Sequence, residues 1–181
     1  MMSHLAASAL LAALSAFAMP ALSAPVDASS HRVEVGFSPD GDAQAVVLRA
    51  IASARSEIVV GAYSFTSKPV SEALRAAHRK GVKVFVLADE KSNVGQYSAV
   101  AFLANAGVTV RTIGKYAIYH NKFIVIDRQH VQTGSFNYSS SAQKRNAENV
   151  LVLYDVPSLA QAYLKQWSQD WEAGQPVAAR Y

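Results

Sequence analysis

The residues best suited to chemistry lie close together, in the stretch from His120 to Asn149. The pattern H-x-K-x4-D begins at His120 and ends at Asp127, and the pattern G-S-x-N follows from Gly134 to Asn137. An imidazole can act as a nucleophile or a base, whereas an ammonium, a hydroxyl and a carboxamide can donate hydrogen bonds to phosphate oxygens. These residue types therefore indicate chemistry at a phosphate group.

The two patterns fall on two neighbouring strand-like runs, which we expect to form a hairpin. Alternate residues of a strand share a face, so His120 points the same way as Lys122, and Ser135 points the same way as Asn137. The four side chains are therefore expected to converge at the rim of a sheet. Asp127 has the opposite parity, which favours a role in bracing the loop over contact with a substrate.

Chance is a poor explanation for the two patterns together. With this composition, H-x-K-x4-D arises in roughly one sequence in a hundred of this length. A G-S-x-N at one fixed spacing multiplies those odds by about another 10⁻⁴.

A metal site built from His120, Asp127 and His130 is the competing interpretation. Its spacing matches no common ligand pattern, however, and Lys122 would repel a cation.

The excess positive charge of the chain lies in the same stretch. The sequence has 17 basic and 13 acidic side chains, a net charge of +4, and residues 111–150 carry six basic and two acidic side chains. The rest of the chain is therefore balanced, and a focused positive region suits an anionic ligand. The basic residues are Arg111, Lys115, Lys122, Arg128, Lys144 and Arg145.

Apolar periodicity around these motifs predicts strands alternating with helices, and hence an α/β fold. We expect a mixed β-sheet flanked by helices on both faces, in one domain covering residues 31–181. Val33, Val35 and Phe37 share one face of the first strand, and the apolar stripe of the last helix is expected to pack in the core. The expected strands are 31–37, 58–63, 82–88, 108–113, 122–127, 130–135 and 148–154, and the expected helices are 42–54, 67–80, 96–106 and 157–172.

Residues 1–24 have the layout of a secretory signal peptide, with an apolar run followed by small residues. Cleavage is expected after Ala24, with Ala18 as the alternative, and residues 25–30 read as a flexible lead-in. The apolar run is shorter than a typical membrane-spanning helix, so no stable membrane anchor is expected. A buried N-terminal helix is less favoured because caps and a polar face are missing. The chain is therefore predicted to be periplasmic or secreted, and the absence of cysteine suits an oxidising compartment.

The motif from His120 to Asp127, with G-S-x-N after it, resembles the HKD motif of the phospholipase D superfamily. The match is closest to the small periplasmic endonucleases of that superfamily, which carry a single motif. Residues 37–39, 62–66 and 144–149 and the Trp-rich last helix also resemble that group. Phospholipase D enzymes normally combine two HKD motifs in one active site, whereas this chain has one. The resemblance therefore implies a symmetric homodimer, because a two-fold axis places identical residues against each other.

The resemblance also implies a mechanism without a metal or another cofactor. One His120 attacks phosphorus to form a phosphohistidine, and the partner subunit's His120 protonates the departing oxygen. Lys122, Ser135 and Asn137 are implied to bind the phosphate oxygens. Glu148 is implied to hold a ring nitrogen of His120, as the carboxylate of a catalytic triad does.

As the last residue of the motif, Asp127 joins His120, Lys122 and Glu148 in the implied catalytic set, although its parity favours a structural role.

The motifs and the resemblance together predict a metal-independent, sequence-nonspecific endonuclease acting on DNA or RNA. Two alternatives stay open, a phosphodiesterase acting on phospholipids and a non-catalytic nucleic-acid-binding module. The first predicts an apolar entry surface near the site, and the second predicts binding without turnover.

Overall fold

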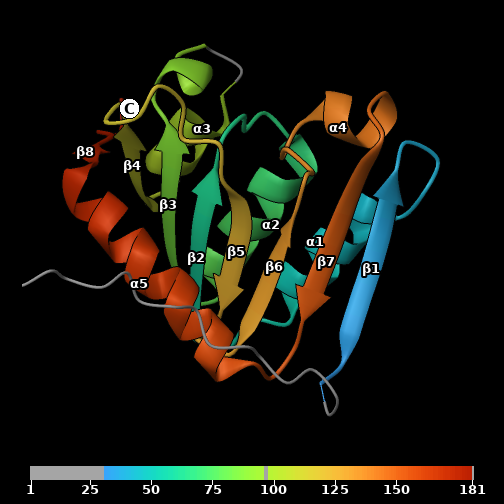
Figure 1. Ribbon diagram of the computed structural model, residues 1–181. Coiled ribbons are helices and arrows are strands. Elements are labelled where there is room, and N and C mark those ends of the chain that lie inside the picture. Colours follow the sequence, from blue (N-terminus) through green and yellow to red (C-terminus); the bar gives the residue numbers. More distant parts are fainter. Residues whose placement is uncertain (1–30, 96–97, 181) are drawn as a thin grey trace, which may run out of the picture.

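The computed structural model describes residues 31–95 and 98–180, so the predicted signal peptide and lead-in lie outside the described residues. These residues form one eight-stranded mixed sheet in the order β1-β7-β6-β5-β2-β3-β4-β8 (Figure 1). The strands are β1 (Val33–Ser38), β2 (Glu57–Ala62), β3 (Lys83–Asp89), β4 (Thr109–Ile113), β5 (Lys122–Ile126), β6 (His130–Gly134), β7 (Glu148–Leu153) and β8 (Gln175–Pro176).

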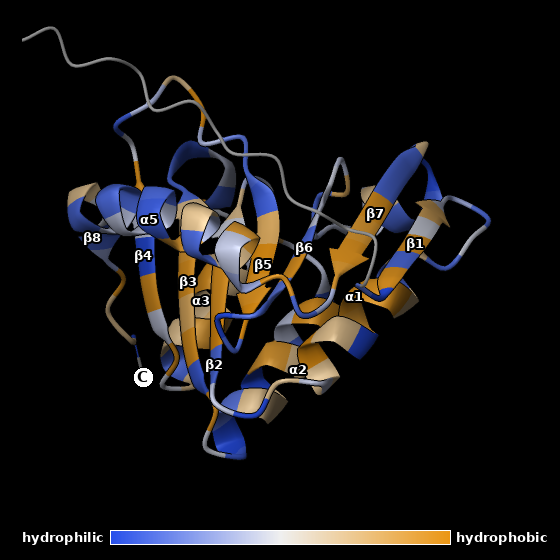
Figure 2. Cartoon of the chain, turned by 60° about the horizontal axis from the view of Figure 1, so that its bottom comes forward, coloured by the Kyte–Doolittle hydropathy of each residue, from blue (hydrophilic) through white to orange (hydrophobic). Residues whose placement is uncertain are grey.

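Helices cover both faces of the sheet, as the sequence predicted. Helices α1, α2 and α3 pack on one face of the sheet around a large apolar core, and α5 packs on the other face around a smaller core (Figures 1 and 2). None of the helices within 31–95 and 98–180 is long and apolar enough to cross a membrane. The helices are α1 (Ala43–Ala52), α2 (Lys68–Arg79), α3 (Ala99–Asn105), α4 (Ser140–Lys144) and α5 (Pro157–Ala173), with a 3-10 turn at Lys91–Asn93.

Local sequence signals account for the ends of α2. Ser67 is the N-cap and its hydroxyl accepts a hydrogen bond from the Val70 backbone N–H at 3.4 Å. Pro69 lies in the first turn, where its missing N–H costs nothing. Gly81 ends the helix with a φ of +91°, a conformation that glycine adopts without strain. The Pro/Gly asymmetry read from the sequence is therefore confirmed.

Strand direction brings several chain segments to one edge of the sheet. β2, β3 and β4 are mutually parallel, and β5 runs antiparallel to β2. The edge where the parallel strands end is consequently the edge where β5 and β7 begin and where β6 and β1 end. We call it the site edge, and it is the upper edge of the sheet in Figure 1. Ligands of open α/β sheets commonly bind at the carboxyl ends of parallel strands.

β1 exposes the apolar face that its alternation marked out in the sequence. Val33, Val35 and Phe37 are 44%, 51% and 60% exposed, because the main contacts of α5 with the sheet are made to β4, β5 and β6. Their cross-strand neighbours on the same face, Leu151 and Leu153, are half-buried. We call these five residues the uncovered face. Of the helices that the structure describes, none lies in front of it in Figure 1.

The opposite face of β1 packs against α1. A Cβ atom on Gly36 would lie 2.9 Å from the Ala43 Cα atom, so only glycine permits this close approach. The sequence did not predict α4, the 3-10 turn or β8. Each is five residues or shorter, too short for a periodic apolar pattern.

Candidate active site

The site edge brings together the residues that the sequence predicted to meet. His120 lies two residues before Lys122, the first residue of β5, while Ser135 follows β6 and Glu148 begins β7. β6 lies between β5 and β7, so the starts of β5 and β7 are two strand spacings, about 10 Å, apart. This arrangement depends on antiparallel pairing of β5 with β6 and of β6 with β7.

Lys122 is a buried ammonium, 8% exposed, at the base of the site. Its Nζ donates a hydrogen bond to the His120 carbonyl oxygen at 2.8 Å and lies 4.8 Å from the centre of the Tyr63 ring. Burial lowers the pKa of Lys122 to about 8, and the negative charge of Glu148 partly opposes that shift. A partly desolvated cation of this kind can bind a phosphate oxygen strongly.

His120 is exposed at the rim, above Lys122. Its imidazole packs against Tyr63 with the ring centroids 4.6 Å apart and the planes at 60°. Phe123 and Val125 point to the α5 face, as the strand parity predicted. Ile124 points to the opposite core, so β5 is buried on both faces and can hold the His–Lys pair rigidly.

Glu148 is held by its neighbours in this chain. Ser135 Oγ donates to Glu148 Oε2 at 2.6 Å, and Asn146 Nδ2 donates to Glu148 Oε1 at 2.9 Å. The predicted contact between Glu148 and His120 is not formed within the described chain, where both carboxylate oxygens have these other partners. Asn149 completes the cluster, since its backbone N–H and its Nδ2 donate to Ser135 Oγ at 3.1 and 3.3 Å.

Asn137 lies just beyond β6, not on the strand where the parity argument placed it. Its Oδ1 is buried and accepts no hydrogen bond among the described residues. The next residue, Tyr138, is buried and anchors the loop, because its carbonyl accepts hydrogen bonds from the Thr66 and Ser67 N–H groups at 2.8 and 2.7 Å. The loop is therefore fixed, and the role of Asn137 in phosphate binding remains a prediction.

Asp127 lies at the opposite edge of the sheet, so its assignment to the catalytic set is corrected. Its carboxylate accepts hydrogen bonds from the backbone N–H groups of Arg55, Ser56 and Glu57 at 2.7–2.9 Å. Desolvation alone would raise the pKa of Asp127, but these hydrogen bonds outweigh it and lower the pKa. The residue ties the β5–β6 turn to the start of β2, which is the bracing role that parity favoured.

The alternative metal site fails for the same reason. His120 lies at the site edge, whereas Asp127 and His130 lie at the other end of the β5–β6 hairpin. Within the part of the chain that the structure describes, no three His, Asp or Glu side chains cluster where they could hold a metal ion.

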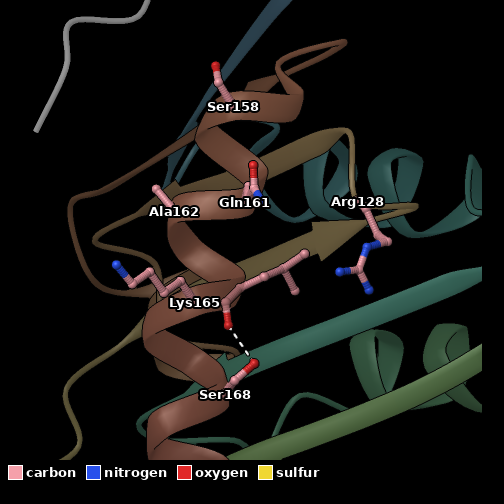
Figure 3. A pocket seen from close by; sticks show the side chains of 7 residues that line it. Arg128, Ser158, Gln161, Ala162, Lys165 and Ser168 are labelled. Atoms are coloured by element: carbon pink, nitrogen blue, oxygen red, sulfur yellow. Dashed lines mark hydrogen bonds between the residues drawn. The ribbon is translucent and has the colours of Figure 1, made fainter.

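Two of the six basic residues of 111–150 lie away from the site. Arg128 pairs with Glu57 at 3.4 Å and borders a surface hollow of about 470 Å³ along α5, whose lining contains no histidine (Figure 3). Arg111 donates to the Trp171 carbonyl oxygen at 2.7 Å. The expectation that all six basic residues form one positive region is therefore corrected for Arg111 and Arg128. The other four basic residues of 111–150 lie on elements of the site edge and are Lys115, Lys122, Lys144 and Arg145.

Tyr63 and Asn149 are site residues that neither motif nor residue spacing predicted. Tyr63 directly follows β2, and β2 lies beside β5 only in the tertiary fold. Both residues belong to segments that resemble the small endonucleases, 62–66 and 144–149, and that similarity was the available signal. Their contacts depend on strand pairing and could not be read from spacing.

Comparison with known proteins identifies the family. The sequence model described as cardiolipin synthase, PLD-like domain, matches residues 47–171, which is most of the chain. The chain belongs to the phospholipase D superfamily. The resemblance carried by the H-x-K-x4-D motif is thereby confirmed.

Relatives in the phospholipase D superfamily share much of the chain. A phospholipase D of Rickettsia bellii is 36% identical over 139 residues, covering 77% of this chain and 69% of that protein. A mitochondrial cardiolipin hydrolase of Mus musculus is 31% identical over 131 residues, covering 72% of this chain and 59% of that protein.

Solved structures confirm the phospholipase D-like fold. Nuc from Salmonella typhimurium, described as a phospholipase D family member, matches with a TM-score of 0.81 at 39% identity and covers 83% of this chain and 100% of its own. NucT from Helicobacter pylori matches with a TM-score of 0.75 at 23% identity, a likeness of fold. The chain is thus a phosphodiesterase of the phospholipase D superfamily, and the alternative of a non-catalytic binding module is set aside.

Proposed function

We propose that this phosphodiesterase is a metal-independent, sequence-nonspecific endonuclease that cleaves DNA or RNA through a phosphohistidine at a homodimer interface. The observation that carries the proposal is the single His120–Lys122 pair, which one chain presents at an open edge beside exposed cations. Lys115, Lys144 and Arg145 are all exposed on elements of that edge. Such a surface suits a polyanion that extends beyond the scissile phosphate.

The uncovered face supports the homodimer. It exposes apolar side chains that a folded chain normally buries, and it runs along β1 and β7 to the site edge, where Phe37 pairs with Asn149. A second copy of this chain is the occupant we propose, because the sequence holds one HKD motif and the site needs two histidines. A two-fold axis through this region would cover both apolar faces and bring the two motifs together.

The proposed chemistry balances without a metal ion. Unprotonated His120 attacks phosphorus, the bond to the leaving ribose oxygen breaks, and the partner subunit's His120 gives its proton to that oxygen. The partner subunit's His120 then takes a proton from water, whose oxygen attacks phosphorus and breaks the P–N bond. The ammonium of Lys122 stabilises charge on the phosphoryl oxygens in both steps.

A phospholipid substrate is the second candidate. Relatives of this chain are named phospholipase D and mitochondrial cardiolipin hydrolase. Apolar side chains are also exposed at the site edge, where Phe37 is 60% exposed, Ile118 50% and Tyr116 37%. An apolar rim of this kind suits acyl chains, so the cations and the rim favour different substrates.

A digestion panel separates the two candidates. Plasmid DNA, single-stranded DNA, RNA and short-chain phosphatidylcholine are each incubated with the purified protein in excess EDTA. We expect cleavage of nucleic acid and no release of choline, with no gain on adding magnesium. Choline release without nicking would establish the lipid candidate, and activity that vanishes in EDTA and returns with magnesium would refute the metal-independent mechanism.

We also propose that the protein is exported to the periplasm or secreted after removal of residues 1–24. This follows from the apolar run and the small residues after it. N-terminal sequencing of the protein released from the producing cell should begin at Pro25. A mature protein that begins at Met1 in the cytoplasm would contradict the proposal.

A further inference from the structure

We propose that Tyr63 is a positioning residue, whose aromatic ring holds the imidazole of His120 and the ammonium of Lys122 in their reactive arrangement. The ring, rather than the hydroxyl, makes both contacts. The inference rests on the phosphodiesterase chemistry of the proposed function, but not on whether the substrate is nucleic acid or lipid.

Two contacts of the same ring carry this inference. The Tyr63 centroid lies 4.6 Å from that of His120 and 4.8 Å from Lys122 Nζ. Strand register produces this proximity, because Ala62, the last residue of β2, pairs with Lys122, the first residue of β5. Tyr63 is half-buried, so the ring is partly packed and has limited freedom to rotate.

The backbone of Tyr63 is itself held in place by residues at the end of β3 and in the 3-10 turn that follows it. Asn93 is buried, and its Nδ2 donates to the Tyr63 carbonyl oxygen at 2.6 Å and to the Asp89 carbonyl oxygen at 2.8 Å. Its Oδ1 accepts a hydrogen bond from the Phe65 N–H at 3.1 Å. The carboxamide therefore fixes the segment on both sides of Ser64 and leaves little freedom at Tyr63.

The same end of β3 holds the segment that carries His120. Asp89 is 2% exposed, and its Oδ2 accepts a hydrogen bond from the Tyr119 N–H at 2.7 Å. The residues before His120 and the residue packed against it are thus anchored to one short segment, residues 89–93. This shared anchor is the expected arrangement if the contact between the two rings must be kept during turnover.

The aromatic face gives the ring a second role. A cation near the face of a tyrosine ring is stabilised by the ring quadrupole, and more so where water is excluded. Lys122 is buried, so Tyr63 favours its charged form against the effect of burial. A leucine at position 63 would keep much of the burial and lose the quadrupole.

The test compares Tyr63→Phe and Tyr63→Leu with the unmodified protein on bis(p-nitrophenyl) phosphate, plasmid DNA and short-chain phosphatidylcholine. For Tyr63→Leu we expect kcat to fall about tenfold or more with KM changed less than about threefold. The alkaline limb of the pH profile should also move about 0.5–1 pH unit toward acid. Tyr63→Phe should stay within about twofold of the unmodified protein, because it keeps the ring.

A matched control is available at the opposite edge of the sheet. Tyr154 also lies beside a cation and an imidazole, with the Arg32 guanidinium 4.3 Å and the His130 ring 5.2 Å from its centroid. Tyr154→Leu removes a comparable ring far from His120 and should leave the pH profile unchanged. Thermal unfolding of each variant shows that the folded protein is being assayed.

A readout without turnover completes the test. The imidazole proton signals of His120, assigned by their loss in His120→Asn, should carry a ring-current shift that Tyr63→Phe keeps and Tyr63→Leu removes. Wild-type kcat and pH profile in Tyr63→Leu, or equal losses in both variants, would overturn the inference. Hydrolysis of the nitrophenyl diester without DNA cleavage would refute the nuclease alone, and an unmodified protein inactive on all three substrates would refute both.

Discussion

Replacing Lys122 with methionine is expected to stabilise the fold slightly while removing most of the turnover. Lys122 is 8% exposed, and burial lowers its pKa from 10.5 to about 8. This shift corresponds to about 3 kcal/mol by which the folded state disfavours the charged form. Methionine fills similar space without a charge but loses the contact with the Tyr63 ring, worth about 1 kcal/mol. It also loses the hydrogen bond to the His120 carbonyl oxygen, worth about 1 kcal/mol. The net gain in unfolding free energy at pH 7 is therefore about 1 kcal/mol.

The gain should depend on pH in a defined direction. The pKa of Lys122 is lower in the folded state, so the unfolded state binds more protons between about pH 8 and 10.5. The wild-type protein therefore gains stability as pH rises through this window. The difference in unfolding free energy between Lys122→Met and the wild-type protein becomes smaller as a result. At pH 7 the variant should melt about 2–4 °C higher, and near pH 10 the difference should mostly disappear.

Thermal and urea unfolding at pH 7 and 10 measure this effect at one fixed protein concentration. Lys83→Met is the matched control, because Lys83 is also the first residue of a strand but is exposed. The turnover of Lys122→Met should fall by about 10²–10³, the loss typical of removing one group that stabilises a transition state. A melting temperature unchanged or lowered at pH 7, or a difference that does not vary with pH, would refute the reasoning.

Three further predictions concern the nucleophile, the brace and the pH profile. His120→Asn should abolish cleavage with the dimer intact by sedimentation, and normal turnover would refute the assignment of the nucleophile. Asp127→Ala should lower the unfolding free energy by about 2–3 kcal/mol, because it frees backbone N–H groups at the start of β2, yet leave kcat of the folded enzyme within about twofold. A large loss of kcat at full stability would restore Asp127 to the catalytic set. Cleavage should follow a bell-shaped pH profile, because the attacking His120 must be unprotonated while the partner subunit's His120 and Lys122 must be protonated, and a monotonic rise from pH 4 to 10 would contradict it.

The elements that were correctly predicted from the sequence are those with long periodic patterns or clear end signals. The periodicity of 157–172 predicted α5, and Ser67, Pro69 and Gly81 marked α2 correctly. The short polar turn expected at 128–129 distinguished the β5–β6 hairpin from a helical crossover. Apolar alternation in β1, however, could not show that its face is exposed, because exposure depends on where α5 ends across the sheet.

The sequence by itself determined the family, the fold class and the His120–Lys122 pair, because those depend on residue types at short, fixed spacings. Only the tertiary structure decided what surrounds the pair. Strand pairing places the Tyr63 ring against His120. It also puts Asp127 and Arg128 at the opposite edge of the sheet, where they contact Ser56 and Glu57. The Glu148 carboxylate accepts its hydrogen bonds from Ser135 and Asn146. Contacts between segments far apart in the chain depend on sheet order and register, which no local pattern specifies.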